Sequence, residues 1–185
     1  MTFDFSEFKN KKIIVTGSST GIGFETGVEF LNLGANVIFH GNQSINDLET
    51  RIKAKSQSQK FKIFKSDFTD LSQVDNFMNN AINYLNGLDI LVNNAGTMVG
   101  RYQLETISEK DFLKIFDLNA KSAYFATKSA CTIFKKQNYG NIINVSTISA
   151  RTGGSAGSSV YAASKAFVSG ITRSLVSELS PYNIR

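Results

Sequence analysis

The chain has 185 residues, of which 42% are hydrophobic and 19% charged, a composition typical of one globular domain and not of a disordered or fibrous chain. No apolar run approaches the ~20 residues that cross a bilayer, the N-terminus lacks the layout of a signal peptide, and the single cysteine, Cys131, excludes an internal disulfide. We therefore expect a cytoplasmic protein with no membrane partner. The net charge of +5 comes without a nucleic-acid-binding motif, so we expect no nucleic-acid partner, and one histidine and one cysteine predict no metal site.

Short apolar runs alternate with amphipathic segments along the whole chain. The pattern predicts strands at 12–16, 37–39, 61–64, 90–92 and 141–146, and helices at 21–33, 44–55, 71–84, 109–134 and 158–179. Gly34 is expected to end the first helix, residues 151–159 are rich in glycine and serine and predict a flexible wall, and residues 183–185 resemble the start of a sixth strand. Strands that alternate with helices predict a single α/β domain over residues 1–185, with a parallel sheet covered on both faces.

A glycine-rich turn joins the first predicted strand to the first predicted helix. Gly17, Gly21 and Gly23 allow a tight turn and the close approach of a diphosphate to the helix N-terminus, where free N–H groups and the helix dipole favour an anion. Gly27 lets the helix lie close to the sheet. The glycine spacing is that of neither the G-x-G-x-x-G fingerprint nor the P-loop, so a purely structural turn is the alternative interpretation.

Tyr161 and Lys165 are four residues apart on a predicted helix and therefore share one face. A fixed ammonium group beside a phenol favours the phenolate form. Such a pair can give or take a proton beside a carbonyl group, although by itself it is more often a solvated surface pair.

Three motifs occur together in this chain: Thr-Gly-Ser-Ser-Thr-Gly-Ile-Gly at 16–23, Asn-Asn-Ala-Gly at 93–96 and Tyr-Ala-Ala-Ser-Lys at 161–165. In order and spacing they resemble the classical short-chain dehydrogenase/reductase family, and the look is closest to the 3-oxoacyl carrier-protein reductases. The resemblance covers about residues 12–185. It implies a Rossmann-type doubly wound parallel sheet of strand order 3-2-1-4-5, with the family's strands six and seven, and with them most of the substrate-determining part, missing from this sequence.

The resemblance also implies a dinucleotide site. The residues expected to bind the cofactor are Gly17, Ser19, Thr20, Gly21, Ile22, Gly23, Asn42, Asp67, Phe68, Asn94, Ala95, Gly96, Tyr161 and Lys165. Asp67 would hold the adenine ring, although a turn or N-cap role is the alternative. Gly41 stands where NAD enzymes usually place an acidic residue, so nothing there repels a 2′-phosphate. The arginine that commonly binds this phosphate is also missing, with Thr20 and Asn42 at its two expected positions. We expect NADP(H) in preference to NAD(H).

The catalytic residues implied by the resemblance are Asn119, Thr147, Tyr161 and Lys165. Tyr161 would be the general acid/base, Lys165 would hold the nicotinamide ribose, and Asn119 would bend its helix and anchor a water molecule. Thr147 stands where the family has a serine that binds the substrate oxygen, and Ser146 and Ser149 remain alternatives for this role.

Together these features predict an NADP(H)-dependent oxidoreductase that transfers a hydride between nicotinamide and a small carbonyl or hydroxyl substrate. A carrier-protein-bound substrate is one option, because Lys135 and Lys136 could meet an acidic carrier, although a solvated helix end is the simpler interpretation. The helices at 109–134 and 158–179 are those that pair subunits in the family, which implies a homo-dimer or homo-tetramer. The alternative function is a non-catalytic dinucleotide-binding relic that has lost the substrate lobe.

Overall fold

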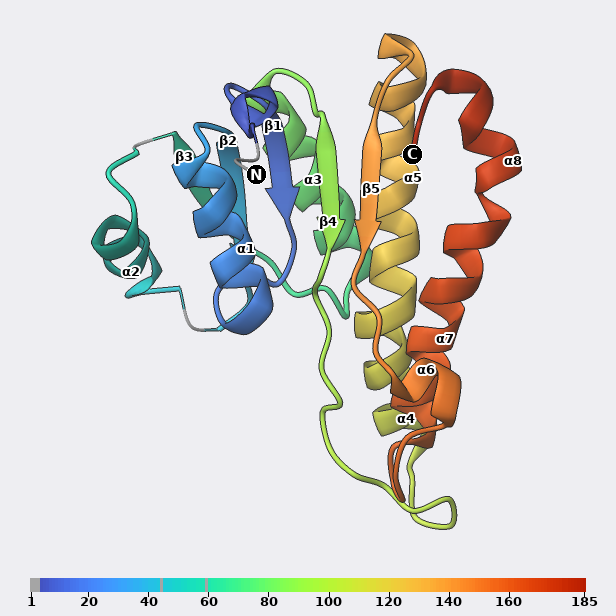
Figure 1. The fold of residues 1–185 in the computed structure, drawn as a ribbon. Helices are drawn as coiled ribbons and strands as arrows, with labels where there is room; N and C mark the ends of the chain where they lie inside the picture. The colour runs from blue at the N-terminus through green and yellow to red at the C-terminus, as the bar shows by residue number, and fades with distance from the viewer. Residues whose placement is uncertain (1–3, 44, 59) are drawn as a thin grey trace.

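The computed structural model describes residues 4–43, 45–58 and 60–185. Within these residues a parallel five-stranded sheet has the order β3-β2-β1-β4-β5 (Figure 1). Its strands are β1 (Lys12–Val15), β2 (Asn36–Gly41), β3 (Phe61–Lys65), β4 (Ile90–Asn93) and β5 (Asn141–Asn144). The predicted Rossmann-type α/β fold and strand order are confirmed.

Two hydrophobic layers cover the two faces of the sheet, because successive side chains of a strand point to opposite faces. Ile13 and Val15 of β1 pack with residues of α1 (Gly21–Asn32) and α2 (Leu48–Lys55). Ile14 packs with residues of α3 (Leu71–Leu85) and α5 (Ser122–Gln137) on the other face. The central strands are therefore buried on both sides. The carboxyl ends of β1, β2 and β4 lie at one edge of the sheet, and the strand order reverses between β1 and β4.

The two long predicted helices are interrupted. Residues 109–134 form α4 (Glu109–Phe116), a π-helical turn η2 (Asp117–Lys121) and then α5. The amide of Asn119 donates to the carbonyl oxygens of Ile115 and Thr97, both at 2.8 Å, so its side chain is held inside the molecule at this turn. The expected bend at Asn119 is thus a π-turn, a feature frequently found at functional sites.

The second long helix is α7 (Ser159–Ser174) followed by α8 (Val176–Leu179), and both lie beside α5 at the β5 end of the sheet (Figure 1). The predicted start of the second helix at Ser44 lies outside the described residues, and α2 begins at Leu48. The short elements are η1 (Ser6–Phe8), α6 (Ser149–Thr152) and η3 (Ser180–Tyr182). The segment predicted as a wall of glycine and serine therefore begins with one helical turn.

That segment is also tied to the loop after β4. Arg101 Nη1 donates to Ser155 Oγ at 2.7 Å, and Tyr102 N donates to the Gly157 carbonyl at 3.0 Å. At the open side of β5, Ile184 forms a parallel bridge with Gly140, so the expected approach of residues 183–185 to the sheet is present at one bridge. No helix among the described residues is long and apolar enough to span a membrane.

Candidate active site

The glycine turn after β1 is bonded directly to the segment after β4. Thr16 Oγ1 accepts hydrogen bonds from the backbone N–H groups of Asn94 and Ala95, each at 3.0 Å. The Asn94 amide donates to the carbonyl oxygens of Thr16 and Gly17, both at 2.9 Å. Two of the three sequence motifs therefore hold each other in place, and Asn94 serves as the brace between them.

Close backbone approach explains two of the glycines in this turn. Gly17 has φ +61°, and a Cβ atom on it would lie 2.6 Å from Cα of Ala95. A Cβ atom on Gly23 would overlap the Asn94 amide. Thr20 makes no side-chain cap on α1, so the first N–H groups of this helix remain available to an anion, as a diphosphate site requires.

His40 supports the turn from β2, a role that the sequence did not reveal. Its Nδ1 accepts from the Gly17 N–H at 2.9 Å, and its Nε2 lies 3.1 Å from the Ser66 carbonyl. These partners require the neutral tautomer with the proton on Nε2. Burial lowers the pKa of His40 from 6.5 to about 4, so the ring stays neutral at physiological pH. The ring stacks on Phe68 with centroids 3.9 Å apart.

A cleft runs along the carboxyl ends of these strands. The predicted cofactor residues that line it are Gly17, Ser19, Thr20, Asn42, Asp67, Phe68, Ala95 and Gly96. Gly41, which the sequence analysis placed at the ribose position, also lines it. Residues that sequence reasoning did not assign line it too, and they are His40, Gln43, Ser66, Thr69, Thr97, Val99, Lys114 and Leu118. The other predicted cofactor residues do not line this cleft: Gly23 and Asn94 are beneath the turn, Gly21 and the 70% exposed Ile22 begin α1, and Tyr161 and Lys165 lie on α7.

Asp67 is held as a carboxylate at the edge of this cleft. Partial burial alone would raise its pKa, but hydrogen bonds from the backbone and hydroxyl of Thr69 and from the Asn42 side chain lower the pKa below its ordinary value. Its Oδ1 accepts from Thr69 N at 2.9 Å and from Thr69 Oγ1 at 2.8 Å. Asp67 therefore combines the turn role with a place on the cleft wall, so the two interpretations of this residue are compatible.

At the other end, three predicted residues meet at Gly96. A Cβ atom on Gly96 would overlap Oδ1 of Asn119 and would lie 3.0 Å from Nζ of Lys165. Asn119 is fully buried, and its Oδ1 has no hydrogen-bond partner among the described residues. Lys165 Nζ donates to the Val145 carbonyl at 3.0 Å, and burial lowers the pKa of this ammonium group.

The four candidate hydroxyl groups differ in their bonding: Ser146 and Thr147 lie in the segment after β5, Ser149 begins α6 and Tyr161 lies on α7. Ser146 Oγ is 2.9 Å from Ser169 Oγ and 3.2 Å from the Lys165 carbonyl, so it faces the backbone of α7. Thr147 Oγ1 accepts from Ser149 N at 3.3 Å, which leaves its O–H free to donate. The Tyr161 hydroxyl makes no hydrogen bond within the described part of the chain.

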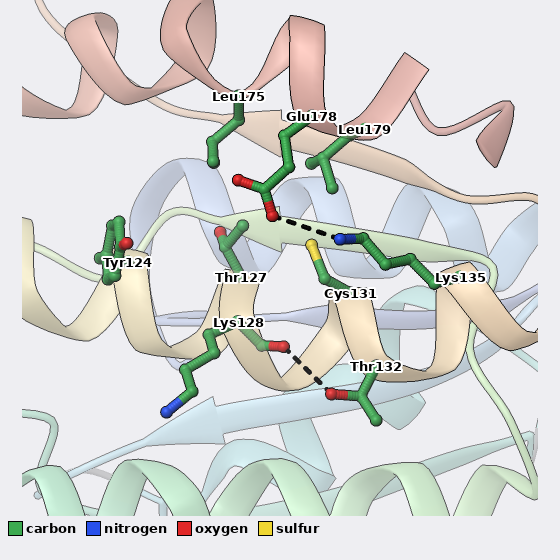
Figure 2. Close-up of a pocket in the computed structure, with 9 residues that line it drawn as sticks. All are labelled: Tyr124, Thr127, Lys128, Cys131, Thr132, Lys135, Leu175, Glu178 and Leu179. Atoms are coloured by element: carbon green, nitrogen blue, oxygen red, sulfur yellow. Dashed lines mark hydrogen bonds and ion pairs between the residues drawn. The ribbon is translucent and has the colours of Figure 1, made fainter. Parts of the chain in front are cut away.

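A second pocket lies between α5 and α8, as Figure 2 shows. Lys135 forms an ion pair with Glu178 across it at 3.2 Å, and Cys131 points toward it. Burial raises the pKa of the Cys131 thiol, so this group stays a neutral thiol. None of the predicted site residues lines this pocket, and the reactive groups gather at the strand ends instead.

The residues at the strand ends fit a dinucleotide. Gly21 at the start of α1 has open space on its Cβ side, the α1 N–H groups are uncapped, and the buried Asn119 Oδ1 needs a donor that the described residues do not supply. Gly17, Ser19 and Thr20 would hold the diphosphate, Asp67 and Phe68 would border the adenine, and Gly96 with Lys165 would border the nicotinamide end.

Known proteins are similar to this chain along nearly its whole length. A 3alpha-hydroxysteroid dehydrogenase of Mediterraneibacter gnavus is 35% identical over 187 residues, which cover 98% of this chain and 72% of that protein. The hydroxynaphthalene reductase-like protein Arp2 of Metarhizium acridum is 32% identical over 166 residues, which cover 89% of this chain and 61% of that protein. The chain thus spans between 61% and 72% of the length of these relatives.

Solved structures agree with this. The crystal structure of NADH-dependent reductase A1-R′ complexed with NAD superposes with a TM-score of 0.91 at 32% identity, covering 98% of this chain and 78% of that one. The sequence also matches the family described as short chain dehydrogenase over residues 11–185. These matches and the geometry at the strand ends show that the chain belongs to the short chain dehydrogenase family, a family of nicotinamide-dependent oxidoreductases.

Proposed function

We propose that this protein is an NADP(H)-dependent oxidoreductase that interconverts a small carbonyl compound and its alcohol, with Tyr161 as general acid/base. The observation that carries the proposal is the close approach of the Asn119 amide and the Lys165 ammonium group to Gly96 at the end of the cleft, where a side chain larger than glycine has no room. A dinucleotide-binding relic has no need of a buried lysine and an unpartnered buried amide at this place, since both cost stability.

The bound nicotinamide supplies the hydride in this reaction. Thr147 donates a hydrogen bond to the carbonyl oxygen and polarises it, because its hydroxyl proton is not used by the protein. Tyr161 then delivers a proton to the same oxygen. Lys165 shares the helix face of Tyr161 and lies beside Gly96, where it would bind the nicotinamide ribose and orient the cofactor beside Tyr161. Asn119 supplies a buried acceptor for the water that restores the proton.

The preference for NADP(H) rests on the end of β2. A carboxylate at this place would repel a 2′-phosphate. The residue here is Gly41, so this repulsion is absent. The solved relative described above is NADH-dependent and holds NAD, so the cofactor class agrees while the phosphate preference of this chain is our proposal.

A Tyr161→Phe variant tests the catalytic role. We expect a loss of roughly 10²- to 10⁴-fold in turnover because a positioned general acid contributes that much. Cofactor binding should persist in the variant. Thermal unfolding measures this binding, because a ligand that binds only the folded state at a hundredfold excess over Kd stabilises it by about 2.7 kcal/mol. Unchanged turnover in the variant would reject Tyr161 as the acid, and a wild-type chain that binds the cofactor without turnover would favour the relic.

The proposal extends to the partners and the location of the protein. We propose a cytoplasmic homo-dimer or homo-tetramer formed through α4, α5 and α7, which carry a surface cluster of four aromatic rings: Phe112, Phe116, Tyr124 and Phe167. A carrier-bound substrate has weaker support, because Lys135 is already paired with Glu178. Light scattering measures the assembly, and a monomer at micromolar concentration would reject it.

A further inference from the structure

The end of β2 carries a glycine that its surroundings do not allow to be larger. A Cβ atom on Gly41 would lie 2.7 Å from Cβ of Ser19 and 2.8 Å from Cγ2 of Ile45. In dinucleotide-binding sheets this strand end is where the adenosine ribose is bound. An acidic side chain therefore has no room here, and Ser19 borders the ribose end of the cleft in its place.

A guanidinium group reaches the same corner from α2. Arg51 Nη2 donates to the Ser19 carbonyl at 2.7 Å, and the guanidinium lies 4.6 Å above the centre of the Phe24 ring. These two contacts hold the planar group against the glycine turn. The side chain of Arg51 is still 34% exposed, and it forms a loose, exposed ion pair with Asp47, in which Nη1 lies 3.7 Å from Oδ1, beyond hydrogen-bond distance. Arg51 thus has N–H donors left for a ligand.

The other cations of α2 are directed elsewhere. Lys55 is bonded to both carboxylate oxygens of Glu25, at 2.6 and 2.8 Å. Lys53 forms an exposed pair with Glu49 at 2.5 Å. On this helix the positive charge at Ser19 therefore comes from Arg51.

We propose that Arg51 is the residue that selects NADP(H), by pairing its free guanidinium N–H groups with the 2′-phosphate at the corner formed by Ser19 and Gly41. The inference rests on the proposed function, because it concerns the same dinucleotide cleft. A planar guanidinium fork matches two phosphate oxygens at once, and its brace on Ser19 and Phe24 reduces the ordering cost of binding.

The test compares Arg51→Gln and Arg51→Lys with the control Lys53→Gln, which removes the same charge from the same helix away from the cleft. Titration calorimetry measures binding of NADPH and NADH, and of adenosine 2′,5′-bisphosphate against adenosine 5′-monophosphate. In Arg51→Gln we expect NADPH and the bisphosphate to bind roughly 10- to 100-fold more weakly, the usual range for a lost hydrogen bond between charged groups. NADH and the monophosphate should change by less than about twofold.

The ratio of the two affinities separates ligand recognition from a structural role. Equal weakening of NADPH and NADH in Arg51→Gln would mean that Arg51 only braces the glycine turn, and this would overturn the proposal. Arg51→Lys, which keeps the charge and loses the fork, should show an intermediate ratio. An unchanged ratio in both variants would also overturn it. In the wild type, added salt should weaken NADPH binding more than NADH binding.

Failure of the wider function gives a different result. If the wild-type chain binds neither NADPH nor NADH, the proposed dinucleotide site itself is wrong. If the wild type binds NADH more tightly than NADPH, the proposed cofactor preference and the proposed role of Arg51 are both wrong, while the oxidoreductase assignment is unaffected. If the wild type prefers NADPH and the Arg51→Gln variant keeps the same preference, only the proposed role of Arg51 is wrong.

Discussion

The two ends of the cleft differ in how fully their polar groups are bonded. At the glycine-turn end, Thr16, His40 and Asn94 each bond to backbone groups of the turn or of the neighbouring strands. At the α7 end, Asn119 Oδ1 is buried without a partner in the described residues, and the Tyr161 hydroxyl is not bonded there either. At the glycine-turn end the named side chains are used to hold the backbone, so that mainly backbone N–H groups of α1 are left for a ligand, whereas at the α7 end side-chain groups themselves are left for ligand and water.

This difference separates binding from chemistry. Bonds within the glycine turn fix the backbone before a ligand arrives, which reduces the ordering cost of binding. Unpartnered groups at the α7 end cost stability and are characteristic of catalytic sites. Substitutions at the turn should therefore act mainly on stability and cofactor affinity, whereas substitutions near α7 should act mainly on turnover.

After the Tyr161→Phe variant described above, the largest effect in this comparison is expected at Thr147. Thr147→Val keeps the shape of the side chain and removes the hydroxyl donor, so we expect a fall of roughly 10²- to 10³-fold in kcat, the usual cost of one donor to a developing oxyanion. The free energy of unfolding should change little, because the hydroxyl only accepts a 3.3 Å bond from Ser149 N. Steady-state kinetics with a saturating cofactor measures this change.

Ser146→Ala and Ser149→Ala are the matched controls for Thr147. Ser146 bonds to the α7 backbone, so its loss should lower stability and leave the chemical step nearly unchanged. Thr147→Ser should retain most of the activity. If Ser149→Ala abolishes turnover while Thr147→Val does not, Ser149 is the donor and our assignment is wrong.

The next effect is a pH dependence at the glycine-turn end, and it comes from His40. The folded-state pKa of about 4 lies below the ordinary 6.5, so between these values the unfolded chain binds more protons. The stabilisation is complete above pH 6.5 and is lost as the pH falls toward 4. Between pH 7.5 and 4.5 this amounts to about 2.5 kcal/mol of unfolding free energy.

His40→Gln removes this titration while an amide can still accept from Gly17 and donate to Ser66. The wild type should therefore lose about 2.5 kcal/mol more than the variant over that pH range, as measured by urea unfolding. Lowered carboxylate pKa values such as that of Asp67 act in both proteins and cancel in the difference. Parallel pH profiles would show that the buried ring is not what titrates.

Much of the glycine-turn end could be predicted from the sequence, because its local motifs specify local geometry. Gly17, Gly23 and Gly27 stand where backbone or ring atoms approach within a Cβ distance, and Gly34 ends α1 with φ +87°. Contacts made through space could not be predicted in this way. The bond from Gly17 to His40 joins the glycine turn to β2, and Arg51 reaches Ser19 from α2.

The helix breaks show the same limit at the α7 end. The apolar spacing continues through residues 109–134, so periodicity alone predicts one helix. The helix changes to a π-turn at Asp117–Lys121, where the Asn119 amide donates to the Thr97 carbonyl after β4, a tertiary contact that apolar spacing does not reveal. The role of the hydroxyl after β5 stayed open for a related reason, since three candidates within four residues differ only in their partners in the fold.

A smaller effect is expected at Gly27, on the helix behind the glycine turn. Alanine ordinarily stabilises a helix interior relative to glycine, but a Cβ atom here would lie 2.5 Å from the fully buried Phe39 ring. We expect Gly27→Ala to lower the unfolding free energy by about 1–2 kcal/mol, because overpacking exceeds the gain in helix propensity. Urea unfolding checks this, and a more stable variant would mean that the ring moves aside freely.

The smallest effect is expected at Gly170, the matched glycine in the interior of α7. A Cβ atom on Gly170 meets no atom within 4 Å, so only the loss of backbone freedom in the unfolded chain remains. Gly170→Ala should therefore raise the unfolding free energy by about 0.5–1 kcal/mol, and the midpoint by roughly 1–4 °C in a thermal scan. The change in unfolding free energy is thus expected to be negative for Gly27→Ala, where a Cβ atom is crowded, and positive for Gly170→Ala, where a Cβ atom has space. A loss of stability at Gly170 would mean that α7 is covered by another surface, as the proposed subunit pairing through this helix would provide.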